Sequence, residues 1–106
     1  MITEHRVDQA LHFLIETADE AAQARADLSS LEESKKSLKA VLMKEHEGSI
    51  AAQEREAYAD ERYLQHTAGL KEATYNLHRL LLRREAAKAT IDAWQTQSAN
   101  QRATSL

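Results

Sequence analysis

The chain has 106 residues but contains no proline and only two glycines. Proline costs about 3 kcal/mol inside a helix and glycine about 1 kcal/mol, so their scarcity leaves long runs free to be helical. Gly48 stands where the helical rhythm of apolar residues stops, and Ser49 follows it as a candidate cap for the next helix. The sequence therefore predicts an all-α fold, a long coiled-coil-like helical hairpin that turns near its middle.

The predicted hairpin forms a single helical domain over residues 1–106. Its expected parts are a helix over residues 3–46 with Thr3 as N-cap, a hinge at 47–49, a short helix over 50–59, a long helix over 60–98 and a frayed polar tail over 99–106. Asp60 offers a second break as an N-cap, so both two and three helices fit the pattern. Gly69 lies inside the last helix, where it either weakens the helix or marks a close contact.

Apolar residues define one seam on each long helix. In the first helix we expect a seam that starts with alternating steps of four and three, shifts by about one position through the alanine-rich segment 18–26, and has Lys35 in a later gap. Its expected members are Val7, Leu11, Leu14, Ala18 and Ala21, then Leu28, Leu31, Leu38 and Leu42. The expected face of the last helix comprises Tyr63, Leu70, Leu77, Leu81, Ile91 and Trp94, with Thr67, Thr74, Arg84 and Ala87 completing the spacing. Two helices bury only one stripe apiece against each other, so a second stripe would need a partner, and we expect a homo-oligomer.

Composition narrows the compartment and the chemistry. The chain has no cysteine, which fits a reducing compartment, and no run approaches the roughly 18 apolar residues of a membrane span. The start of the chain lacks a basic segment followed by an apolar run, so we expect a cytoplasmic protein that does not enter membranes.

The net charge of −3 is unevenly distributed along the chain. Residues 1–48 contain 6 Lys/Arg against 10 Asp/Glu, residues 49–60 contain 1 against 3, and residues 61–106 contain 7 against 4, so the charges are −4, −2 and +3. Attraction between antiparallel arms is one interpretation, and an anion-binding face on the second arm is another.

Motifs for catalysis are absent from the sequence. It has no phosphate-binding glycine loop, no Gly-x-Ser-x-Gly elbow and no His-Glu-x-x-His helix, and its five histidines form no pair three or four residues apart. His12 and Glu16 could place two ligands on one turn, but no third ligand accompanies them. We expect neither an enzyme nor a metal or cofactor site.

Basic clusters are the best candidates for a binding site. The last helix carries Arg79, Arg83, Arg84 and Lys88 on adjacent turns, and the first helix carries Lys35, Lys36 and Lys39. An antiparallel hairpin would place the lysine cluster near residues 60 to 70. Such strips could bind nucleic-acid phosphates in a salt-sensitive way, or they could be ordinary solvated faces with local carboxylate partners. Arg84 falls on the seam itself, where it could form an interchain ion pair, line a pore or snorkel.

Aromatic residues could add base stacking beside these cations. Tyr63 and Trp94 share a stripe with leucines, which favours core packing, whereas Tyr58 near the hinge is the least constrained.

Two segments carry a resemblance to known proteins. Residues 54–63 read EREAYADERY and residues 86–100 read AAKATIDAWQTQSAN. These segments resemble a group of small phage and prophage helical proteins with a central E-R-E-A-Y segment and a terminal A-x-I-x-x-W-R-x-x-x-A-N segment. More distantly, the arrangement is similar to the UvsY recombination mediators of T-even phages.

The resemblance implies a ring of helical hairpins that binds single-stranded DNA and helps to load a recombinase onto strands covered by single-strand binding protein. Arg55 matches the basic position before that family's aromatic segment, and Tyr58 matches the first aromatic. The chain departs from the pattern where it has Gln53 and Glu54 beside Arg55, and where Gln95 replaces the arginine after the tryptophan. Both departures remove positive charge.

Two functions of different classes follow. The first is an accessory protein of phage DNA recombination that binds single-stranded DNA through its basic strips, acting as a mediator or oligomeric scaffold with a recombinase or single-strand binding protein as partner. The second is a protein-interaction adaptor or structural coiled coil that binds no nucleic acid. Salt-sensitive binding of single-stranded DNA would distinguish the first from the second.

Overall fold

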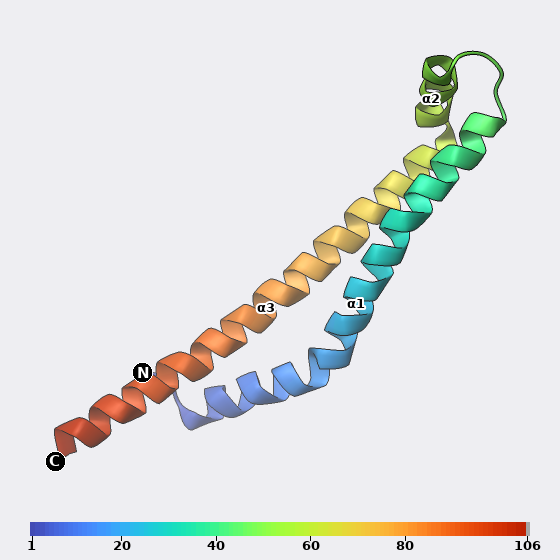
Figure 1. Cartoon of the computed structure of the whole chain (residues 1–106). Coiled ribbons are helices and arrows are strands. Elements are labelled where there is room, and N and C mark those ends of the chain that lie inside the picture. Colours follow the sequence, from blue (N-terminus) through green and yellow to red (C-terminus); the bar gives the residue numbers. More distant parts are fainter. Residues whose placement is uncertain (106) are drawn as a thin grey trace. The chain divides into compact units, whose positions relative to one another are not determined.

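Three helices make up the described part of the chain, residues 1–105 of a computed structural model. They are α1 (Glu4–Lys44), α2 (Ile50–Ala59) and α3 (Glu61–Ser105), and no strand occurs among these residues (Figure 1). The all-α hairpin with a short helix between two long ones is therefore confirmed. Helix α3 continues to Ser105, so residues 99–105, which the polar composition led us to expect as frayed, are helical.

The helix ends depend on the local chemistry of a few residues. The Thr3 hydroxyl accepts a hydrogen bond from the Arg6 N–H at 3.2 Å, as an N-cap does. Gly48 has a φ of 111°, in the left-handed region that favours glycine, and the Ser49 hydroxyl then caps α2 by accepting from the Ala52 N–H at 3.2 Å. Asp60 interrupts the helix between α2 and α3 with extended backbone angles of −67° and 134°.

The chain divides into two compact units. The terminal unit comprises Met1–Ala22 and His78–Leu106, and the hinge unit comprises Gln23–Leu77. Parts of α1 and α3 pair in each. In the terminal unit Ile2 contacts Gln97 and Leu14 contacts Arg84; in the hinge unit Leu31 contacts His66 and Lys35 lies over Tyr63. The two numbers of each of these four pairs add to between 97 and 99, so both units follow the same antiparallel register.

The seam of α1 is regular from end to end, which corrects the shifted seam expected from the sequence. Along it, buried and half-buried residues follow one another by alternating steps of three and four, and they are Val7, Ala10, Leu14, Thr17, Ala21, Ala24, Leu28, Leu31, Lys35, Leu38 and Leu42. Phe13, Lys39 and Met43 are half-buried beside this row. Leu11 is 43% exposed and Ala18 is exposed, so neither belongs to the seam. Thr17 can be buried instead because its hydroxyl donates to the Phe13 carbonyl at 2.7 Å.

The core is thin and rich in small side chains. Its buried apolar members are Val7, Ala10, Ala21, Leu42, Ala57, Leu77, Leu80 and Ala87, so half of them are alanines. On α3, Leu80 is buried whereas Leu81, which the pattern favoured, is only half-buried. Burial stabilises in proportion to apolar area, so this core contributes less than one built from leucine throughout. Polar contacts between the helices therefore matter more to stability than they would in a globular domain. The same is true of contacts made by apolar side chains that lie outside this core.

The hydropathy of the helices also shows whether any of them could cross a membrane. Within the described residues, none of the helices has the length and apolar character that crossing a bilayer requires.

Candidate nucleic-acid interface

Two lysines and two tyrosines meet in the hinge unit. The Lys39 ammonium of α1 lies 4.7 Å from the centroid of the Tyr58 ring on α2, and the Lys35 ammonium lies 5.6 Å from that of Tyr63 on α3. The two rings meet edge to face, with centroids 5.3 Å apart and planes at 70°. We call Lys35, Lys39, Tyr58 and Tyr63 the hinge cluster. Cations over aromatic faces are attracted by the ring quadrupole, so each lysine is held by its ring.

Carboxylates moderate the charge of this cluster. Glu54 Oε1 lies 3.4 Å from Lys39 Nζ. Outside the cluster, Glu33 Oε1 lies 3.1 Å from Nζ of the neighbouring Lys36. The Tyr58 side chain first, and Glu54 second, raise the pKa of Lys39 above its ordinary value, so this amine stays protonated at neutral pH. Arg55 is exposed and makes no ion pair within residues 1–105. Lys36 and Arg55 are thus the more accessible cations near the cluster.

One arginine, Arg62, links the two ends of the segment that joins α1 to α3. Arg62 Nη2 lies 2.6 Å from Glu45 Oε2 and 2.9 Å from Asp60 Oδ2, and Asp60 Oδ1 also accepts from the Arg62 backbone N–H at 2.8 Å. Arg62 lowers the pKa of both carboxyl groups, while Asp60 first and Glu45 second raise the pKa of Arg62. Glu45 directly follows α1 and Asp60 directly precedes α3, so this ion triad joins both sides of the hinge.

Sequence reasoning missed the triad and a second contact of the hinge. The Gln53 side chain donates from Nε2 to the His46 carbonyl at 3.0 Å, which ties α2 to the loop that precedes it. The only sequence signal for the triad was Arg62 two residues after the Asp60 cap. Nothing in the pattern identified Glu45 as the partner across the turn.

The basic strip expected on α3 does not form a single array. Arg84 is half-buried and donates from Nη1 to the Leu14 carbonyl at 2.8 Å and to the Thr17 hydroxyl, so it crosses the seam within one chain. Arg83 lies with its guanidinium 4.9 Å from the centroid of the Phe13 ring. Arg79 and Lys88 are exposed and make no ion pair within residues 1–105. Within one chain, Arg84 therefore acts as a hydrogen-bond donor across the seam.

The predicted site residues therefore fall into two groups. Lys35, Lys36, Lys39, Arg55 and Tyr58 belong to the hinge unit, whereas Arg79, Arg83, Arg84 and Lys88 belong to the terminal unit. The hinge unit has 8 Lys/Arg against 10 Asp/Glu, which leaves −2, and the terminal unit has 6 against 7, which leaves −1. Neither unit is basic as a whole, so anion binding would depend on local clusters.

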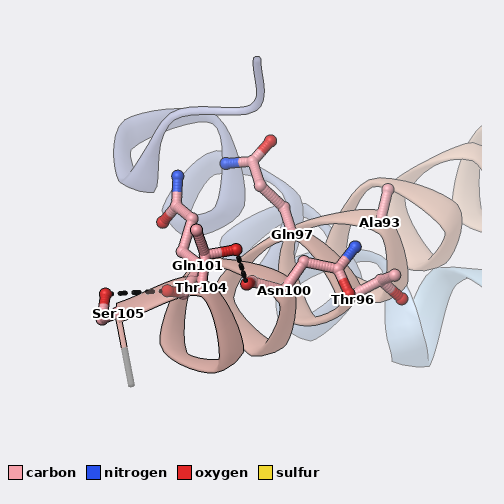
Figure 2. Close-up of a pocket in the computed structure, with 7 residues that line it drawn as sticks. All are labelled: Ala93, Thr96, Gln97, Asn100, Gln101, Thr104 and Ser105. Atoms are coloured by element: carbon pink, nitrogen blue, oxygen red, sulfur yellow. Dashed lines mark hydrogen bonds between the residues drawn. The ribbon is translucent and has the colours of Figure 1, made fainter.

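Polar side chains line a surface hollow near the end of α3 (Figure 2). The lining residues are Ala93, Thr96, Gln97, Asn100, Gln101, Thr104 and Ser105. The Thr104 hydroxyl donates to the Asn100 carbonyl, and the Ser105 hydroxyl donates to the Gln101 carbonyl. The Gln97 side-chain amide accepts from the Ile2 N–H at 3.2 Å and donates to the Ile2 carbonyl at 3.1 Å. No group that titrates near neutral pH lines this hollow, so it offers no acid or base for catalysis.

Histidine and carboxylate groups show one close pair. His12 Nε2 lies 2.8 Å from Glu16 Oε1, with both side chains largely exposed. Among residues 1–105, no three histidine or carboxylate side chains gather as they would around a metal ion. The pair is therefore best described as an exposed contact within one helix.

Comparisons of the chain with protein-family models, with curated proteins and with solved structures found no match.

Proposed function

We propose that the chain binds single-stranded nucleic acid through the hinge cluster and acts as a non-enzymatic accessory protein of DNA recombination. The observation that supports this function is the meeting of two ammonium groups with two tyrosine rings, beside the exposed cations Lys36 and Arg55. Single-strand binders combine cations that follow the phosphates with aromatic rings on which bases stack. Tyr58, which is 44% exposed, is the ring a base could reach.

The resemblance to phage proteins adds the biological setting to this proposal. In that setting the protein would work in the cytoplasm of a bacterial host, with a recombinase or a single-strand binding protein as partner. The positions that support the resemblance, Arg55 and Tyr58, both belong to α2, and Tyr58 is a member of the hinge cluster.

Fluorescence anisotropy with a labelled oligothymidylate tests the proposal over a range of salt concentrations. We expect binding at low salt that weakens as salt rises, with the slope of log K against log salt falling by about 0.7 for each phosphate contact that is removed. Lys36→Gln and Arg55→Gln should each reduce this slope, whereas Tyr58→Leu should weaken binding by about 1–3 kcal/mol with little change in slope. Lys71→Gln is the matched control, an exposed cation of the same unit outside the cluster.

A folded protein that binds no oligonucleotide at low salt would overturn the proposal. Unchanged affinity in Lys36→Gln, Arg55→Gln and Tyr58→Leu would overturn the assignment of the site.

A second candidate function is a self-associating helical scaffold or protein-interaction adaptor without nucleic-acid binding. It is supported by large apolar side chains on the outside of a thin core, including Ile15 at 75% exposed and Leu11 at 43%, and by the negative net charge of both units. Contiguous exposed apolar surface is typical of interaction sites. Light scattering on the anisotropy sample distinguishes this function, which requires association without DNA.

A further inference from the structure

The terminal unit has a groove whose lining combines small side chains with cations. Residues of both helices line it, and they are Arg6, Gln9, Ala10, Phe13, Arg83, Ala86, Ala87 and Thr90. The alanines leave space beside the half-buried Phe13 ring, over which the Arg83 guanidinium lies at 4.9 Å. No carboxylate lines the groove, and Arg6 makes no ion pair within residues 1–105. The groove therefore fits a helix face that is apolar and acidic.

The same unit carries such a face on α1. Residues spaced by alternating steps of four and three form what we call the outer stripe, and they are Glu4, Asp8, Leu11, Ile15, Ala18 and Ala22. All are exposed, Leu11 at 43% and Ile15 at 75%. The stripe contains two carboxylates and no cation, and neither carboxylate makes an ion pair within residues 1–105. It is the acidic, apolar counterpart of the groove.

The stripe cannot fill the groove of its own unit. At about 100° per residue, the direction of the stripe around α1 differs from that of Arg6, Gln9, Ala10 and Phe13 by about 170°. The two surfaces therefore lie on nearly opposite sides of the helix, with the seam between them. One can meet the other only on a different molecule.

We infer that the outer stripe of one copy docks in the groove of a second copy, with Leu11 and Ile15 against Phe13 and the alanines, and Glu4 and Asp8 near Arg6 and Arg83. This inference rests on the self-association proposed above and is independent of nucleic-acid binding. The contact is heterologous, because each copy offers a different surface to each neighbour, so it adds copies head to tail. Small residues allow helices to approach closely, and the charges set the partner and orientation.

Two double variants test the inference by sedimentation velocity with the full chain. The groove variant is Arg6→Glu with Arg83→Glu, and the stripe variant is Leu11→Lys with Ile15→Lys. Arg6, Leu11 and Ile15 lie on α1 and Arg83 lies on α3. All four are exposed, so circular dichroism should show unchanged helicity. We expect each variant to associate at least about tenfold more weakly than the unmodified chain. Leu82→Lys and Lys88→Glu are the matched controls, an exposed apolar residue and an exposed cation outside both surfaces, and they should associate normally.

Mixing the two variants gives the decisive measurement. The groove variant keeps its stripe and the stripe variant keeps its groove, so an equal mixture should form a species of two chains, twice the 12.0 kDa chain mass, and nothing larger. A mixture that stays monomeric would overturn the head-to-tail contact. Association of either variant at the unmodified strength would overturn these surfaces while leaving self-association standing, whereas an unmodified chain that stays monomeric would overturn both.

Discussion

The hinge unit and the terminal unit use the same two helices but are held together by contacts of different range. In the hinge unit, Arg62 pairs with Glu45 only 17 residues away, and caps at Ser49 and Asp60 shape the turn. In the terminal unit, Arg84 reaches partners 67 and 70 residues away. The named contacts of the hinge unit therefore join residues closer in sequence than those of the terminal unit, so substitutions should separate the two units.

Leu42→Ala should have the largest effect, and it should affect the hinge unit first. Leu42 is fully buried and is the largest such side chain in the described structure. Its truncation should lower the free energy of unfolding by about 2–5 kcal/mol, through lost burial and a residual cavity. Urea unfolding measures the loss, and hydrogen exchange should show it in residues 23–77. Val41→Ala is the control, because Val41 is 55% exposed and should change stability by less than about 0.5 kcal/mol. Equal losses in the two variants would contradict the assigned seam.

Arg84→Ala tests the terminal unit in the same way. Loss of its charged hydrogen bonds to the Leu14 carbonyl and Thr17 hydroxyl should lower the free energy of unfolding by about 1.5–3 kcal/mol. Hydrogen exchange should accelerate in residues 1–22 and 78–105 before the hinge unit responds. Arg79→Ala, an exposed neighbour, is the control. If exchange rose equally in both units, the comparison between them would fail.

The two glycines of the hinge unit should respond in opposite directions. Gly48→Ala should destabilise by about 1–2 kcal/mol, because its φ of 111° is strained for any residue with a Cβ. Gly69→Ala should stabilise by about 1 kcal/mol, because a Cβ there would meet no atom within 4 Å. Thermal unfolding followed by circular dichroism measures both. Gly69→Ala also tests whether a partner approaches this face of α3. If one does, the added methyl group should weaken self-association while the chain itself becomes more stable.

Acid should weaken the hinge unit through its ion triad, an effect we expect to be the smallest because the triad is solvent-accessible. Arg62 lowers the pKa of Glu45 and Asp60 below their ordinary 4.5 and 3.8. Groups with a lowered folded pKa stabilise above the unfolded value, and the contribution is lost as pH falls through the folded value. Melting temperatures from pH 7 down to below these values should therefore fall more steeply for the unmodified chain than for Arg62→Gln. Parallel profiles would show that the triad contributes nothing.

The comparison also explains what could be predicted from the sequence. Gly48 and Ser49 indicated the hinge, and Asp60 indicated the break that makes three helices, because capping depends on residues close in sequence. The α1 seam was predicted wrongly because Leu11 and Ala18 are more apolar than the Ala10 and Thr17 that the helix buries. Which row is buried depends on the facing helix, and single-helix hydrophobicity does not contain that information.

In the candidate site, too, some features could be predicted from the sequence and others depend on a distant part of the chain. The proximity of the lysines to residues 60 to 70 followed from antiparallel counting, and Lys35 does lie over Tyr63. The single basic strip on α3 did not follow, because spacing alone cannot show that Arg84 points into the seam while Arg83 covers Phe13. Rotamer choice at such positions depends on a carbonyl or ring supplied by another part of the chain.

The Arg84 contact has a consequence for the order of folding. A hairpin that nucleates at its turn closes the 17-residue loop between Glu45 and Arg62 early, since short loops lose the least chain entropy. The 70-residue separation between Leu14 and Arg84 can be closed cheaply only after the intervening turns have paired. Formation of the Arg84 hydrogen bonds therefore marks the late stage of closure, and a chain stalled before that stage would expose the apolar seam of both helix ends to other chains.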